Sequence, residues 1–124
     1  MRKFLLALAF IVLAPAAFAP TAFAQNVVGR YEVRGTNLDG SRYGGRATVT
    51  GVSDTTCTIV WQTGDSTSRG ICMRQGNVLA ASYKLGDSIG LAIYRWRDDN
   101  GYWDGTWTIT GQQGTGTERL VPLR

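Results

Sequence analysis

Apolar and polar side chains alternate along most of the chain after residue 26, and turn residues interrupt the alternation about every ten positions. In the first run, residues 27–34, the charged side chains fall on one face and the opposite face carries Val27, Gly29, Tyr31 and Val33. No window shows the 3.6-residue period of an amphipathic helix. The pattern therefore predicts an all-β chain.

Eight such runs are expected to form strands, at residues 27–34, 42–50, 56–62, 69–74, 78–85, 89–97, 102–110 and 115–123. The connections are too short for the crossovers that parallel strands need, so the sheet should be an antiparallel meander. Closing an eight-stranded meander removes its two bare edges and covers one apolar face. Glycines within the runs would permit the coiling that closure needs. The sequence thus predicts an up-and-down barrel of eight strands. A β-sandwich, which would need longer Greek-key connections, is the alternative.

A disulfide is expected across the third and fourth runs. Cys57 and Cys72 are equidistant from the turn cluster at residues 63–66, so they should face each other across a hairpin. The Cα atoms of a directly opposed pair lie about 4.5 Å apart, which is within the range of a disulfide.

The first 24 residues resemble a secretory signal peptide in their organisation. Two basic residues precede an apolar run at 4–13, and Ala22-Phe23-Ala24 offers a small-x-small cleavage site. A membrane anchor is the alternative, but the apolar run is too short to span about 30 Å of hydrocarbon. We therefore expect a single mature domain at residues 25–124, exported to the periplasm or beyond the cell, without stable membrane insertion.

Charge and composition narrow the function classes. The formal net charge of +4 includes Arg2 and Lys3, so the mature domain would carry +2, and its basic residues are scattered among acidic ones. No nucleic-acid partner is expected from such a surface. The chain has no histidine, which removes the commonest general base and metal ligand.

The carboxylates give no clear catalytic or metal site. The only glutamates are Glu32 and Glu118, and we expect both to point outward and to pair with neighbouring arginines. The acidic run at residues 98–104 matches no calcium loop and has the composition of an ordinary turn. We therefore expect no enzyme activity, no metal and no cofactor.

Large aromatic side chains are the best candidates for a binding site. They could line a pocket at a barrel mouth, or they could simply fill the barrel. The candidate ligand-binding residues are Trp96, Trp103, Trp107, Tyr94 and Trp61. Trp96 and Trp103 rank first because they flank the turn at residues 98–101 and could stack at one end of the barrel.

Several stretches resemble a family of small exported bacterial proteins, some of which carry a fibronectin-binding label. The similar stretches are GRYEVRGTNLDGSRYGG (29–45), GNVLAASY (76–83), IGLAIYR (89–95), DGTWTITG (104–111) and GTERL (116–120). The resemblance covers nearly the whole mature chain and implies a small exported protein, but it brings no catalytic residues. The Gly-x-Trp at residues 105–107 is also similar to the signature of avidin-like and lipocalin-like barrels, although there it opens the first strand.

These observations together favour an exported, non-enzymatic binding module that holds a small apolar ligand or a protein partner. Two alternatives remain open at this point. One is a periplasmic inhibitor of a protease or lysozyme, and the other is a structural envelope protein without a ligand.

Overall fold

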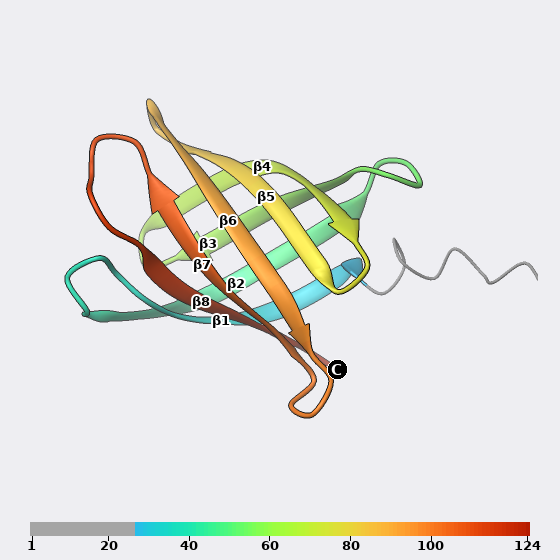
Figure 1. Ribbon diagram of the computed structural model, residues 1–124. Helices are drawn as coiled ribbons and strands as arrows, with labels where there is room; N and C mark the ends of the chain where they lie inside the picture. The colour runs from blue at the N-terminus through green and yellow to red at the C-terminus, as the bar shows by residue number, and fades with distance from the viewer. Residues whose placement is uncertain (1–26) are drawn as a thin grey trace, which may run out of the picture.

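The computed structural model describes residues 27–124, which form a closed antiparallel barrel of eight strands (Figure 1). Each strand pairs with the next along the chain, and β1 pairs with β8 to close the barrel. The predicted meander barrel is therefore confirmed. The expected signal peptide, residues 1–24, lies outside the described residues. The strands are β1 (Gly29–Thr36), β2 (Arg42–Gly51), β3 (Cys57–Thr63), β4 (Ser66–Gln75), β5 (Val78–Leu85), β6 (Ser88–Arg97), β7 (Tyr102–Ile109) and β8 (Gly116–Pro122).

The period-2 pattern decides which side chains enter the barrel, because alternate residues of a strand point to opposite faces. In β1, Tyr31 and Val33 are 3% and 1% exposed, whereas Arg30 and Arg34 point to solvent. The same alternation runs through the other strands. The inward side chains form one continuous core, whose largest fully buried members are Trp103, Tyr94, Ile59, Leu79, Leu120, Val27, Val33 and Val49.

Three of the hairpins turn through only two residues, with glycine first. Gly64, Gly76 and Gly86 each have a φ of 59°, the positive value that a type II′ turn requires at its first central position. As a result β4 begins at Ser66, three residues before the predicted start. The polar residues 66–68 belong to the strand because they pair with β3, with Thr63 opposite Ser66.

The disulfide forms as predicted and joins β3 to β4. Cys57 and Cys72 are directly opposed in the register, with Cα atoms 4.9 Å apart. Both cysteines are buried inside the barrel, so the bond also belongs to the core.

The two ends of the barrel differ. One end carries the connections at residues 37–41, 64–65, 86–87 and 110–115, and the other carries 52–56, 76–77 and 98–101 together with both ends of the described chain (Figure 1). Large side chains pack the second end, including Trp103 and Tyr31, whose hydroxyl donates to the Val27 carbonyl. We call the first end the open end and the second the packed end. Within residues 27–124, no helix has the length and apolar character needed to cross a bilayer.

Candidate functional site: an aromatic cavity with a buried carboxylate

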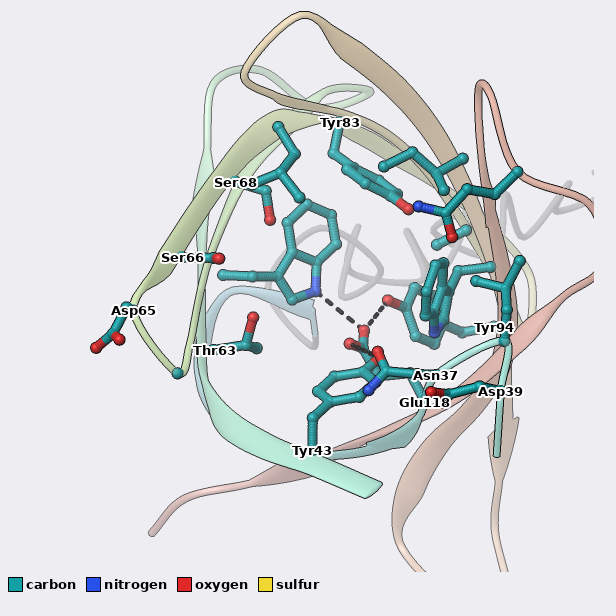
Figure 2. A pocket seen from close by; sticks show the side chains of 18 residues that line it. Asn37, Asp39, Tyr43, Thr63, Asp65, Ser66, Ser68, Tyr83, Tyr94 and Glu118 are labelled. Atoms are coloured by element: carbon teal, nitrogen blue, oxygen red, sulfur yellow. Dashed lines mark hydrogen bonds between the residues drawn. The ribbon is translucent and has the colours of Figure 1, made fainter. Parts of the chain in front are cut away.

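A cavity of about 710 Å³ occupies the open end of the barrel. Loop residues such as Asn37, Asp65 and Gln112 line its outer part, and strand residues such as Ala92 and Glu118 line its inner part. Figure 2 shows the lining side chains, with Asn37, Asp65 and Glu118 among those labelled. This volume lies within the range of small-molecule sites in proteins, roughly 300–1,000 Å³.

The cavity exists because large rings lie opposite glycines. Four aromatic residues that line it pair in register with a glycine of a neighbouring strand: Tyr43 with Gly35, Tyr83 with Gly90, Tyr94 with Gly105 and Trp107 with Gly116. A Cβ added at Gly90 or Gly116 would lie 1.9 Å or 2.2 Å from the ring opposite. Each ring therefore rests against the bare backbone of its neighbour, an arrangement known to fix cross-strand register. Rings held against the wall leave the centre of the barrel open.

Glu118 lies at the centre of this arrangement, and its placement corrects the sequence-based expectation. We expected it to point outward and pair with Arg119, but its side chain enters the barrel and is only 6% exposed. Its register neighbours are Gly35 on β1 and Gly105 on β7, so no side chain beside it blocks the approach of other groups. Glu32, by contrast, does face outward and pairs with Arg34 at 2.9 Å.

Three donors from three other strands converge on the Glu118 carboxylate. The Tyr43 hydroxyl donates to Oε1 at 2.8 Å, and the Trp61 indole N–H donates to Oε2 at 3.0 Å. The Tyr94 hydroxyl also donates to Oε2. Figure 2 shows Tyr43 and Tyr94 directed at the carboxylate from two sides. Such convergent donors stabilise a buried carboxylate, which would otherwise be costly to remove from water.

The electrostatics of the site follow from burial and from this one charge. Burial raises the pKa of Glu118, while the donors from Tyr94, Tyr43 and Trp61 oppose that shift. Burial, and then the negative charge of Glu118, raise the pKa of Tyr83 to about 12. The same causes raise the pKa of Tyr43 and Tyr94 above the ordinary tyrosine value. These tyrosines therefore keep their protons at neutral pH and act as donors.

The structure separates the five aromatic candidates into two groups. Trp61, Tyr94 and Trp107 line the cavity, whereas Trp96 and Trp103 do not. The latter two pair across the β6–β7 hairpin at the packed end, with ring centroids 5.3 Å apart, and Trp103 is 1% exposed. They lie away from the cavity because the turn at residues 98–101 belongs to the packed end. Whether any of the five binds a ligand stays a prediction.

Tyr43, Tyr83 and Glu118 line the cavity but were not among the predicted site residues. One signal could have found the tyrosine at position 83. The turn has only two residues, Gly86 and Asp87, and it places Tyr83 opposite Gly90, where any added Cβ would meet the ring. For Glu118 the signal was its position two residues before the apolar Leu120, because residues two apart in a strand share a face and Leu120 points inward.

One residue of the acidic run at residues 98–104, Asp104 of β7, takes part in ion pairs. Asp104 lies 3.7 Å from Arg97 and 3.6 Å from Arg119. Over residues 27–124 as a whole, no group of three or more Cys, His, Asp or Glu side chains is arranged to hold a metal ion.

Comparison with known proteins gives similarity of fold. No family model matches the chain, and no curated protein matches it in sequence. Among solved structures, a redesigned β-barrel is similar with a TM-score of 0.70 and 17% identity, over 82% of this chain and 96% of that one. The redesigned barrel mFAP1, bound to DFHBI, gives a TM-score of 0.69 and 21% identity over 80% and 97%. A mutant of the fluorescent protein UnaG is similar with a TM-score of 0.53 and 10% identity, over 81% of this chain and 98% of that one. The resemblance to a family of exported bacterial proteins stays a prediction.

Proposed function

We propose that this protein is a non-enzymatic binding module that holds one small, largely apolar ligand inside the barrel. The observation that carries the proposal is the cavity of about 710 Å³, whose wall includes aromatic rings from five strands and one buried carboxylate, that of Glu118. Small-molecule sites commonly combine an apolar wall with a few placed polar groups that fix orientation. The similar barrel mFAP1, which binds DFHBI, is an example of this fold with a small molecule.

The state of the carboxylate favours binding over catalysis. A general base must reach the proton that it abstracts, and it needs a pKa suited to that task. Both oxygens of Glu118 instead accept hydrogen bonds from neighbouring side chains that hold the group in place. Glu118 is therefore suited to orienting a ligand as a fixed acceptor.

A pair of adjacent substitutions tests whether binding takes place inside the barrel. Ser68 of β4 lines the cavity, and its neighbour Thr67 is exposed on the outer face. Ser68→Phe should fill part of the cavity and weaken binding of the neutral dye Nile red by about tenfold or more, whereas Thr67→Phe should leave it unchanged. Fluorescence titration with the purified protein measures both affinities.

Exposed apolar side chains on the outer face of the barrel make the Thr67→Phe control necessary. Ile71 and Met73 on β4 and Leu91 and Ile93 on β6 are all more than half exposed, and they could bind an apolar dye without any cavity. Equal weakening by both variants, or no weakening by Ser68→Phe, would place the dye on that surface and contradict the proposal.

We also propose that the protein works outside the cytosol. The Cys57–Cys72 disulfide supports this location, because such bonds persist in oxidising compartments. The leader pattern of residues 1–24 points the same way. Fractionation of cells that express the full chain, followed by immunodetection, tests the location, and protein confined to the cytosol would contradict it.

A further inference from the structure

The charge inside the cavity is opposite to the charge of the chain as a whole. The chain has 13 lysines and arginines against nine aspartates and glutamates. Among the described residues, however, the charged side chains that line the cavity are all acidic: Asp39, Asp65 and Glu118. Arginines such as Arg46 of β2 and Arg95 of β6 lie on strands that form the cavity wall, but they are exposed on the outer face. A bound anion would therefore be repelled within the cavity, and a cation would be attracted.

Glu118 can accept another hydrogen bond from within the cavity. An ionised carboxylate offers about four lone-pair positions. Oε2 accepts from Trp61 and Tyr94, whereas Oε1 accepts from Tyr43 alone. Oε1 therefore retains the capacity to accept a donor from a ligand. A charged N–H donor would form the stronger, charge-assisted kind of hydrogen bond.

The aromatic wall suits the same kind of ligand. Rings from five different strands line the cavity, and some of them contact one another edge to face. Tyr43 and Trp107 have centroids 6.2 Å apart at 73°, and Trp61 and Tyr83 have centroids 5.4 Å apart at 64°. The faces of aromatic rings are electron-rich, so they attract cations as well as pack against apolar groups.

The two other acidic residues lie at the entrance. Asp39 is exposed in the β1–β2 connection, and Asp65 is exposed in the β3–β4 turn. The backbone N–H and the hydroxyl of Ser41 donate to Asp39, and these hydrogen bonds lower the pKa of its carboxyl, which keeps it ionised. Acidic groups around an opening raise the local concentration of cations there.

We propose that the ligand is a small organic cation, in which a protonated amine is carried on an apolar ring system. The amine donates to Oε1 of Glu118, and the ring system packs against the aromatic wall. This inference rests on the proposed function, because it names the ligand class for the same cavity.

Three probes of nearly equal shape test the sign of the charge. Naphthylmethylamine is a cation at neutral pH, naphthylmethanol is neutral and naphthoate is an anion. Isothermal titration of the purified protein should show the amine binding at least about tenfold more tightly than the alcohol, with the anion weakest. Added salt should lower the affinity for the amine and leave the affinity for the alcohol unchanged.

Two variants locate the charge that decides the preference. Glu118→Gln keeps the size of the side chain and should reduce the affinity for the amine to about that for the alcohol. Glu32→Gln, which removes an exposed carboxylate on the outer face, should change neither affinity. If Glu118→Gln fails to fold, the order of affinities of the unmodified protein for the amine, the alcohol and the anion still tests the inference.

The outcomes distinguish the two proposals. Equal binding of amine and alcohol, or tighter binding of the anion, would overturn the cation inference and leave the binding module standing. An amine preference that survives in folded Glu118→Gln would also overturn it. If no probe binds and Nile red does not bind either, both proposals fail.

Discussion

Two adjacent glycines of β2 should respond in opposite ways to the same substitution. Gly45 faces the inside of the barrel, and a Cβ added there would lie 2.0 Å from the Gln62 carbonyl oxygen and 2.9 Å from the Thr63 Cα. Both of these atoms belong to the backbone of β3, so the strands themselves would have to separate. A Cβ at Gly44, which faces outward, would meet only the Val33 carbonyl oxygen at 3.4 Å, an ordinary contact.

The size of the effect follows from these contacts. Overpacking that shifts the backbone typically costs about 1–3 kcal/mol. In a domain of this size each kcal/mol moves the melting temperature by about 4–8 °C, so Gly45→Ala should melt about 5–20 °C below the unmodified protein. Gly44→Ala reduces the entropy of the unfolded chain without a clash and should be neutral or more stable by up to about 1 kcal/mol.

Thermal unfolding followed by circular dichroism measures both variants under identical conditions. The variants differ by one position in the chain and carry the same new methyl group, so only the direction in which the methyl group points separates them. If both melted within about 2 °C of each other, the close approach of β2 and β3 at Gly45 would be refuted.

Further predictions concern the disulfide, the buried carboxylate, the packed end and the leader. Replacing Cys57 and Cys72 with Ala should lower the free energy of unfolding by about 3 kcal/mol, and an unchanged urea midpoint would contradict a stabilising role. Burial raises the pKa of Glu118 in the folded state, so protonation favours folding, and this stabilisation is lost as the pH rises. In urea titrations, the unmodified protein should therefore lose stability relative to Glu118→Gln as the pH rises above the ordinary glutamate pKa of about 4.3, and a difference that stays constant with pH would count against this reasoning. Trp103→Ala should cost about 3–5 kcal/mol, and a smaller loss in denaturant unfolding would argue against a packed core position. Exported protein should begin at Gln25, which intact-mass measurement can check. A mass that still includes residues 1–24 would contradict this prediction.

Local rules were sufficient to predict most of the fold. The alternation around Tyr31 and Val33 gave the inward face of β1, and the equal spacing of Cys57 and Cys72 from the turn gave the register of β3 and β4. Both signals depend on residues within one strand or one hairpin. Short connections then left few ways to arrange the strands, so the closed meander was accessible from the sequence.

The site was less accessible because it depends on strands that are distant along the chain. Glu118 is stable inside the barrel only because Tyr43 of β2, Trp61 of β3 and Tyr94 of β6 all reach it. No hairpin pattern brings those three residues together, and a glutamate beside an arginine is usually an exposed one. The pairing of aromatic rings with glycines decides which end of the barrel holds the cavity. We predicted a binding site near the turn at residues 98–101, but that turn lies at the packed end, where Trp96 contacts Trp103.

If the proposed ligand enters through the open end, the difference between the open and packed ends separates its rate of exchange from its affinity. The cavity wall is paired strand, whereas its outer part is lined by the connections at residues 37–41, 64–65 and 110–115. A molecule that passes between these loops crosses the same barrier on the way in and on the way out. A loop substitution that narrows the passage without touching the wall therefore slows association and dissociation by one common factor and leaves the dissociation constant unchanged. Residence time could thus be tuned through the loops alone.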